Sequence, residues 1–270
     1  MSDRDLPLLI DAARAAGALA LQYQDRGYDI REKPGQGPVT DADMAVDALL
    51  RDTLSKARPG YGWLSEESTD DPARLLTPRL FVVDPIDGTR AFIKKRPFYA
   101  VSVAVVEGGR PVAGVVFNPA TGELFDAAAG QGARLNGDII KVSDRDAIEG
   151  ARLVGPADMF RSRFWPTPWP MIDIGPSSSI AYALCQVAGG LSHGSVSLTG
   201  KSDWDIAAAD LIVREAGGIA STHQGEGFVY NRPSTRHRNV ISAGPRLHQA
   251  LLTKLSEFNP PPDVARAMMG

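Results

Sequence analysis

The chain is organised around the stretch FVVDPIDGT, which occupies residues 81–89. Its apolar, β-branched start predicts a buried strand, and we expect Pro85 to end that strand because proline cannot donate a hydrogen bond within a sheet. Asp84 and Asp87 would then lie together at the strand end, where two crowded carboxylates favour a cation between them. Gly88 and Thr89 can open a helix, whose N-terminal N–H groups suit an anion. The stretch therefore indicates a metal ion beside a phosphate group.

Taken singly, Asp-Pro or Asp-Gly is typical of an ordinary acidic turn. The whole stretch, however, resembles the signature of the inositol monophosphatase superfamily, the lithium-sensitive, magnesium-dependent phosphomonoesterases. Further segments resemble that family's pattern in the same order, so the resemblance extends from the first predicted helix to Ser242. These segments are Pro38-Val39-Thr40-Asp41-Ala42-Asp43, Leu64-Ser65-Glu66-Glu67 and Trp204-Asp205-Ile206-Ala207-Ala208-Ala209.

The resemblance implies a set of metal ligands that consists of oxygen atoms only. They would be Glu66, Asp84, the backbone carbonyl of Ile86, Asp87 and Asp205. Oxygen donors without His or Cys argue against a zinc-type site and favour Mg²⁺, with Mn²⁺ as the other suitable ion. The resemblance implies roughly two or three such ions.

The resemblance also implies roles in catalysis and substrate binding. Glu66 and Thr89 would act on the attacking water, and the N–H groups of Gly88 and Thr89 would hold phosphate oxygens. Glycine suits that position because it lets the backbone approach the phosphate closely. Asp87 and Asp205 would lie against the bound substrate as well as the metal.

Simpler roles remain open for two of these carboxylates. Asp43 stands three residues after Thr40, in a near capping box, so it can be a helix cap, a group at a further metal, or both. Asp205 follows Ser202, a plausible N-cap, and a helix dipole stabilises an Asp in its first turn without any metal. Adjacent glutamates such as Glu66 and Glu67 are usually just solvated, and only the resemblance gives Glu66 a catalytic role.

The sequence resembles two branches of the superfamily, and each branch implies a different substrate. Inositol monophosphatases carry an acidic residue seven positions before the last Asp, and this position is Leu198 here. The 3′(2′),5′-bisphosphate nucleotidases share Ser65, the basic Arg90 and the run Phe92-Ile93-Lys94, but often have a lysine that is missing after Ser177-Ser178-Ser179. We predict hydrolysis of 3′-phosphoadenosine 5′-phosphate. Inositol 1-phosphate and sugar or histidinol phosphates are the alternatives.

Other chemistries find less support in the sequence. Cys185 has Leu191 where a cysteine-nucleophile loop needs Arg, and Gly200-Lys201-Ser202 resembles the end of a P-loop whose first glycine would fall on Ser195. A nucleotide-binding module is therefore disfavoured. A regulatory relative would be expected to lose a metal carboxylate, and none is lost. We expect the histidines to lie on the surface or in loops; they are His193, His223, His237 and His248.

Composition bounds the class of protein. The chain has 270 residues, 43% of them hydrophobic, and a net charge of −3, which indicates a soluble globular protein without a surface for coating nucleic acid. A single cysteine fits a reducing compartment. Because residues 1–5 lack an apolar signal core and no apolar run could span a membrane, we expect the cytoplasm. The expected partner is a small phosphorylated metabolite, with no nucleic acid and no membrane, and a homodimer is allowed.

The pattern of elements predicts a mixed α/β (α+β) protein. Leu6–Gln24 and a segment starting at Thr40 read as helices around a Pro/Gly loop at 31–38, and strands at 99–107, 111–118 and 124–129 indicate an antiparallel sheet. The basic run Lys94-Lys95-Arg96 suits either a solvated helix end or a rim that attracts anions.

The second half alternates strands and helices, which indicates a mixed sheet. The resemblance implies a layered α-β-α-β-α sandwich, with an N-terminal metal-binding subdomain at 1–147 and a C-terminal subdomain at 148–270 that closes the site.

Overall fold

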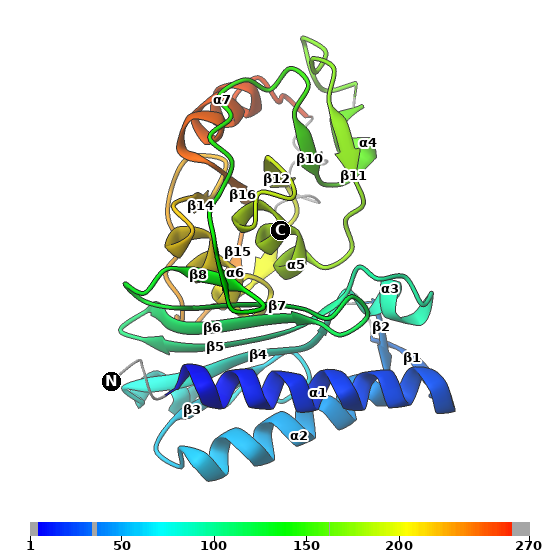
Figure 1. The fold of residues 1–270 in the computed structure, drawn as a ribbon, viewed down its shortest axis with the longest axis vertical. Helices are drawn as coiled ribbons and strands as arrows, with labels where there is room; N and C mark the ends of the chain where they lie inside the picture. The colour runs from blue at the N-terminus through cyan, green and yellow to red at the C-terminus, as the bar shows by residue number, and fades with distance from the viewer. Residues whose placement is uncertain (1–4, 34–36, 162, 261–270) are drawn as a thin grey trace.

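The computed structural model describes residues 5–33, 37–161 and 163–260. Its elements stack in five layers, namely two helices, a seven-stranded sheet, two more helices, a five-stranded sheet and two outer helices (Figure 1). This arrangement confirms the predicted α-β-α-β-α sandwich. In the described part of the chain, no helix is both long enough and apolar enough to cross a membrane.

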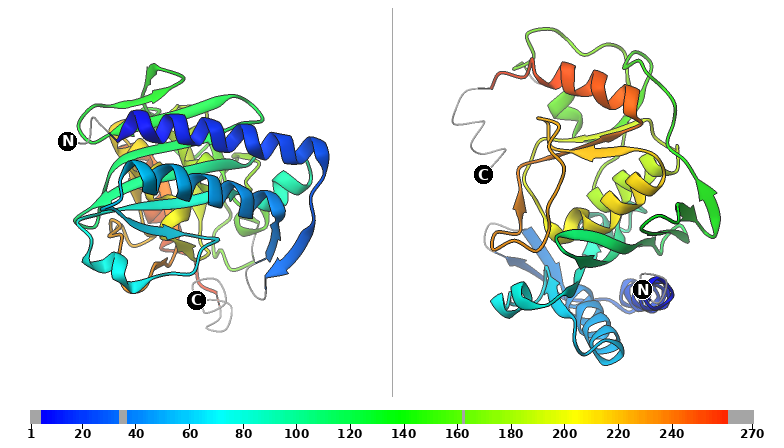
Figure 2. Two further views of the ribbon diagram at one scale, coloured as in Figure 1. Left: turned by 90° about the horizontal axis from the view of Figure 1, so that it is seen from below. Right: turned by 90° about the vertical axis from the view of Figure 1, so that its left-hand side faces the viewer.

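The first sheet is antiparallel apart from the pair β3–β4, which is parallel. Its strands, in spatial order, are β3 (Gly62–Ser65), β4 (Arg79–Asp87), β5 (Ala100–Glu107), β6 (Arg110–Asn118), β7 (Glu123–Ala128), β8 (Ala133–Leu135) and β9 (Asp138–Ile140). Helices α1 (Leu6–Arg26) and α2 (Asp41–Ala57) lie side by side across one face, as Figure 2 shows.

Strand β4 explains how this sheet is held between two helical layers. Phe81 and Val83 pack with α1 and α2, whereas Leu80 and Val82 belong to the cluster on the opposite face. Successive side chains of a strand point to opposite faces, so a strand buried on both sides needs an uninterrupted apolar run. The apolar start of residues 81–89 meets this requirement.

Helices α5 (Ile180–Ala188) and α6 (Asp203–Glu215) cover the second face of the first sheet. Gly114 of β6 allows this close packing, because a Cβ there would lie 3.0 Å from the backbone of Ala208. Although α5 and α6 come from the C-terminal half, they share one hydrophobic cluster with β4 to β7. The halves are therefore joined by a common core, and their division at 147/148 stays a prediction.

The second sheet is mixed, as predicted, with parallel pairs β10–β11 and β10–β12 and antiparallel pairs β12–β16 and β14–β16. Its strands, in spatial order, are β11 (Asp173–Gly175), β10 (Arg152–Val154), β12 (Gly194–Ser197), β16 (Val240–Ala243) and β14 (Ile219–Ser221). The outer helices are α4 (Ala157–Phe160) and α7 (Pro245–Leu255).

Two sequence predictions were wrong, one about the loop at 31–38 and one about the location of the histidines. The predicted loop at 31–38 is largely a hairpin of β1 (Ile30–Lys33) and β2 (Gly37–Thr40), while residues 34–36 lie outside the described part. Two of the four histidines are buried rather than superficial, because His237 pairs with Asp203 and the Nε2 atom of His248 lies 2.9 Å from the Ser221 hydroxyl. Polar partners inside the fold offset the cost of burying both imidazoles.

Candidate metal centre

Three of the predicted ligands meet at one point. Carboxylate oxygens of Glu66, Asp84 and Asp205 all lie within 4.8 Å of one another. Glu66 follows β3 and Asp84 lies in β4, and the two strands are parallel neighbours with Ser65 opposite Val83. Asp205 comes from the first turn of α6. The cluster therefore joins two neighbouring strands to the start of a helix from the other half of the chain.

The stretch after Asp84 does not leave the sheet, so the expectation that Pro85 ends the strand was wrong. Asp84 pairs with Ser102 and Asp87 with Ala100, which places one extra residue on β4. A bulge of this kind tolerates proline, because the irregular residues are not all needed in the ladder. Residues three apart in a regular strand point to opposite faces, and the extra residue lets Asp84 and Asp87 line the same pocket.

Asp87 lies outside the cluster of three carboxylates. Its Oδ2 accepts hydrogen bonds from the Ser179 hydroxyl at 2.6 Å and from the Ala181 N–H at 2.7 Å, at the start of α5. In the described part of the chain, Oδ1 accepts no hydrogen bond. One oxygen thus ties Asp87 to α5, and the other remains for a ligand. The pocket of about 170 Å³ is lined by Pro38, Glu66, Asp84, Asp87, Gly88, Thr89, Arg90, Ser178 and Asp205.

Gly88 makes the turn from β4 into α3 (Thr89–Ile93). Its φ of +92° lies in the left-handed region, and a Cβ there would stand 2.8 Å from the Phe98 carbonyl oxygen and 3.0 Å from the Ser179 nitrogen. Any side chain would push α5 away from the pocket. The glycine is therefore required by close packing as well as by the turn.

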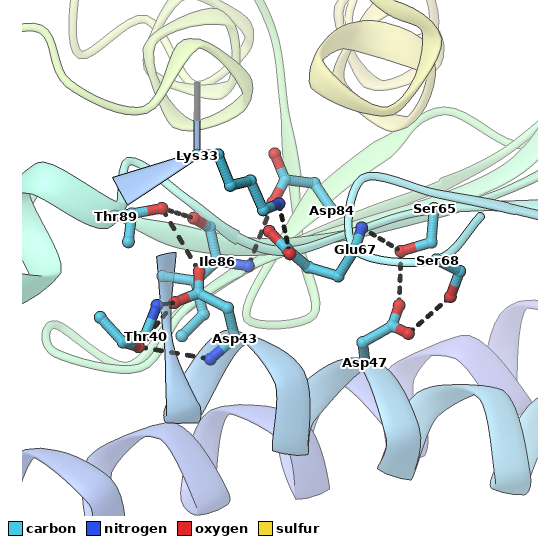
Figure 3. Close-up of polar contacts among 10 residues, drawn as sticks. All are labelled: Lys33, Thr40, Asp43, Asp47, Ser65, Glu67, Ser68, Asp84, Ile86 and Thr89. Atoms are coloured by element: carbon cyan, nitrogen blue, oxygen red, sulfur yellow. Dashed lines mark hydrogen bonds and ion pairs between the residues drawn. The ribbon is translucent and has the colours of Figure 1, made fainter. Parts of the chain in front are cut away.

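Asp43 and Thr89 are joined, as Figure 3 shows. Thr89 Oγ1 lies 3.3 Å from Asp43 Oδ1 and 3.2 Å from the Ile86 carbonyl oxygen. Asp43 Oδ2 accepts from the Thr40 N–H at 2.8 Å, which confirms the predicted cap of α2. Asp43 thus caps its helix with one oxygen and holds Thr89 with the other. It does not belong to the cluster of three carboxylates.

Asp47 is a site residue that sequence reasoning missed. Its carboxylate accepts hydrogen bonds from the hydroxyls of Ser65 and Ser68, on either side of Glu66 (Figure 3). Asp47 lies four residues after Asp43 and three before Leu50, so it belongs to the buried face of α2. A carboxylate at such a position needs a polar partner. An acidic residue on the buried face of α2 was therefore the signal in the sequence that this helix supports the segment carrying Glu66.

Burial and mutual repulsion disfavour the charged forms of the clustered carboxylates. Burial, followed by the charge of Asp205, raises the pKa of Glu66 to about 8. Burial, followed by the charge of Glu66, raises the pKa of Asp84 well above its usual range. Burial raises the pKa of Asp205 as well, although its Oδ2 accepts from the Ser202 N–H at 2.7 Å.

This chemistry fits a hard divalent cation. The cluster offers only oxygen donors, and each donor is a carboxylate that a cation would stabilise in the ionised form. Lys33 approaches the region, but it pairs with Glu67 rather than with the cluster (Figure 3). The residues present therefore suit Mg²⁺ or Mn²⁺.

The metal-free protein is expected to become less stable as pH rises from about 4 to about 8. The pKa values of Glu66 and Asp87 are raised in the folded state, to about 8 and about 7. The folded state thus holds these protons more tightly than the unfolded state, so the stability they contribute is full below about pH 4 and is lost as pH rises through the folded values. Melting temperatures in chelator should fall by roughly 5 °C or more across this range.

Two controls accompany this measurement. Saturating Mg²⁺ should restore the melting temperature at pH 8, because the cation replaces the lost protons. Glu66→Gln should flatten the metal-free profile, since it removes a titrating member of the cluster. A melting temperature in chelator that stays level or rises from pH 4 to pH 8 would contradict the crowding described above.

Comparison with known proteins agrees with this geometry. The model of the inositol monophosphatase family matches residues 3–259. The Nus factor SuhB of Escherichia coli is 34% identical over 268 residues, which cover 93% of this chain and 96% of that protein.

Solved structures point the same way. Extragenic suppressor protein suhB from Bartonella henselae has a TM-score of 0.81 at 29% identity, covering 93% of this chain and 98% of that chain. Thermotoga maritima IMPase has a TM-score of 0.81 at 28% identity, covering 96% of this chain and 98% of that chain. With the family pattern matched over nearly its whole length, the chain belongs to the inositol monophosphatase family.

Proposed function

We propose that this protein is an Mg²⁺-dependent hydrolase of small phosphate monoesters. The observation that carries the proposal is the group of three carboxylates within 4.8 Å of one another, in a pocket that also contains Gly88 and Thr89. Such a group is costly to bury without a cation. A metal site next to an anion-binding turn is suited to phosphoryl chemistry.

Glu66, Asp84 and Asp205 would hold the cations, together with the Ile86 carbonyl and the free oxygen of Asp87. Roughly two or three Mg²⁺ ions are proposed, and Mn²⁺ has the same preference for oxygen ligands. When bound, such ions lower the pKa of a water molecule and neutralise charge on the phosphoryl and leaving oxygens.

The chain's own residues would position the reactants. Thr89 Oγ1, held by Asp43 and the Ile86 carbonyl, would orient the attacking water, and the Glu66 carboxylate would accept its proton. The N–H of Thr89 begins α3, so it has no acceptor within the helix. It can donate to a phosphate oxygen beside Gly88, where the absence of a side chain leaves room.

For the substrate we propose 3′-phosphoadenosine 5′-phosphate, and inositol 1-phosphate is the principal alternative. Leu198 is buried in the hydrophobic cluster between the second sheet and α7, so this position offers no carboxylate to an inositol ring. Arg90 lines the pocket and is exposed, which supports contact with a second phosphate. Against this choice, the relatives named above are called SuhB or IMPase, and none of them is named as a nucleotidase.

Phosphate release from a panel of compounds tests the proposal. We expect 3′-phosphoadenosine 5′-phosphate to have a higher kcat/KM than inositol 1-phosphate, fructose 1,6-bisphosphate or histidinol phosphate. Arg90→Gln should raise KM for the bisphosphate by about tenfold, because it removes one charge-assisted contact of roughly 1.5 kcal/mol. The same change should alter KM for 3′-AMP much less.

Arg96→Gln is the matched control, since Arg96 is an exposed arginine of the neighbouring basic run and does not line the pocket. It should leave both KM values within about twofold. A preference for inositol 1-phosphate would replace the nucleotidase assignment and keep the hydrolase. No phosphate release from any compound at saturating Mg²⁺ would remove the enzymatic proposal.

The name of the bacterial relatives raises a second candidate. Those proteins are called Nus factors, and this chain is 34% identical to one of them. A non-enzymatic, regulatory role could coexist with hydrolysis. However, a protein kept only for regulation would not need the three crowded carboxylates, so their presence favours the enzyme. Three further expectations stay predictions: that the protein is located in the cytoplasm, that it forms a homodimer and that lithium inhibits it.

A further inference from the structure

We propose that Arg74 is a positioning residue that ties the two halves of the metal centre together through Asn231 and Asp203. We call these three residues the Arg74 link. Arg74 lies in the 3₁₀ helix η2 (Pro72–Leu76), shortly after Glu66, and Asp203 is the first residue of α6, which carries Asp205. The proposal rests on the proposed function in one respect, that these carboxylates bind Mg²⁺.

Arg74 is an unusual arginine because only 3% of it is exposed. Its Nε and Nη2 donate to the carboxylate of Asp70 at 2.6 and 2.9 Å. On the other side, Nη1 donates to Asn231 Oδ1 at 2.7 Å and Nη2 to the Arg232 carbonyl at 3.1 Å. One rigid guanidinium thus spans from the segment after Glu66 to a loop of the C-terminal half.

Stability alone is a poor explanation for this arrangement. The ion pair joins the buried guanidinium of Arg74 to the Asp70 carboxylate, whose side chain is 43% exposed, and pairs with an exposed partner contribute little to stability. A planar fork of donors, in contrast, fixes the distance and angle between its partners. The geometry therefore points to positioning.

Asn231 transmits the contact from a left-handed backbone conformation. Its φ is +55°, in the left-handed region that non-glycine residues seldom occupy. Its side-chain Nδ2 donates to the Arg74 carbonyl at 3.4 Å, and its backbone N–H donates to Asp203 Oδ2 at 2.8 Å. Arg74 and Asp203 therefore hold Asn231 from both sides.

Asp203 fixes the start of α6. It is fully buried, its Oδ1 lies 2.7 Å from His237 Nε2, and its N–H donates to the Thr235 carbonyl at 2.9 Å. Asp205 follows in the same helical turn, so an anchor on Asp203 also sets the position of the Asp205 carboxylate. Because Glu66 and Asp205 repel each other without a cation, the Arg74 link holds them at a separation that a cation can bridge.

The test is Mg²⁺ binding to the full chain, measured by calorimetry without substrate. Arg74→Met and Asn231→Gly should each weaken Mg²⁺ binding by roughly 5- to 10-fold, which is less than the loss of about 10- to 100-fold that is typical when a direct partner of a metal ligand is removed, because the link reaches Asp205 only through Asp203. Asn231→Gly is the sharper variant, because glycine adopts the positive φ and keeps the backbone N–H that donates to Asp203, so that only the amide contacts with Arg74 are lost. Its metal-free melting temperature should fall no further than that of the control variant described below, although its Mg²⁺ affinity falls.

Arg79→Met is the matched control. Like Arg74, Arg79 is a largely buried arginine that pairs with carboxylates. Its partners, Asp5 and Glu107, both belong to the N-terminal half. It should lower the melting temperature and leave Mg²⁺ affinity within about twofold. At saturating Mg²⁺, kcat of Asn231→Gly should return to within a few-fold of wild type, whereas at low Mg²⁺ its rate should fall.

The outcomes separate the two proposals. If wild type binds Mg²⁺ and both link variants bind it equally well, the Arg74 link is overturned and the proposed function stands. If wild type binds no Mg²⁺, both are overturned. If Arg79→Met loses as much Mg²⁺ affinity as Arg74→Met, general destabilisation explains the loss in both variants. That result would also overturn the Arg74 link.

Discussion

Asp87→Asn is expected to lower kcat at saturating Mg²⁺ by roughly two decades or more. Oδ2 of Asp87 receives the Ser179 hydroxyl and the Ala181 N–H, and the asparagine carbonyl oxygen can accept both. The fold at the start of α5 should therefore persist, while the charge that faces the pocket is lost. A bound cation would be held less tightly, and charge on the phosphoryl group would be less neutralised.

The same variant should be as stable as wild type without metal, or more stable. Burial, followed by the charge of Asp205, raises the pKa of Asp87 to about 7, so at pH 8 the wild-type carboxylate is ionised and repelled. Asp126→Asn is the control: Asp126 is a buried carboxylate with a raised pKa that does not line the pocket, and kcat should change little. Near-normal kcat with a lowered melting temperature in Asp87→Asn would make residues 84–89 a structural turn only.

Removal of divalent metal is expected to abolish phosphate release, and added Mg²⁺ should restore it. Hydrolysis of phosphate monoesters is among the slowest uncatalysed reactions, and enzymes supply up to ~10²¹-fold acceleration. Without a cation, the cluster of Glu66, Asp84 and Asp205 would offer nothing that lowers the pKa of the attacking water or neutralises charge on the phosphoryl group. The measurement is phosphate release before chelation, in excess chelator and after Mg²⁺ is returned.

Melting curves recorded in parallel keep this result interpretable. The metal-free protein must remain folded at the assay temperature, since its stability is expected to fall toward pH 8. Assays at pH 7 and Mn²⁺ in place of Mg²⁺ extend the test, because Mn²⁺ also prefers oxygen ligands. Undiminished phosphate release in excess chelator would contradict a metal-dependent mechanism for every substrate tested.

Several elements could be predicted from local sequence because their signals are local. The cap at Thr40 and Asp43 depends on residues three apart, and the apolar run before Asp84 depends on burial on both faces of one strand. Pro85 shows where such reasoning fails. Proline argues against a regular strand, but the bulge that accommodates it depends on the register with β5, which a single segment does not specify.

The sequence by itself determined the kinds of groups in the site. It supplied oxygen ligands without His or Cys, a glycine at the turn into α3, and an apolar framework of strands and helices. Only the tertiary structure decided which groups meet. Glu66, Asp84 and Asp205 come together because β3 and β4 pair in parallel and because α6 packs on the sheet to which both strands belong.

The tertiary structure also divided roles among similar residues. Asp87 gives one oxygen to α5, Asp43 holds Thr89 while it caps α2, and Arg74 reaches a loop more than 150 positions away. Neither spacing nor composition distinguishes these carboxylates or this arginine from their neighbours. Contacts between distant segments depend on strand register and helix packing, and these are set by the whole core rather than by any one stretch of the chain.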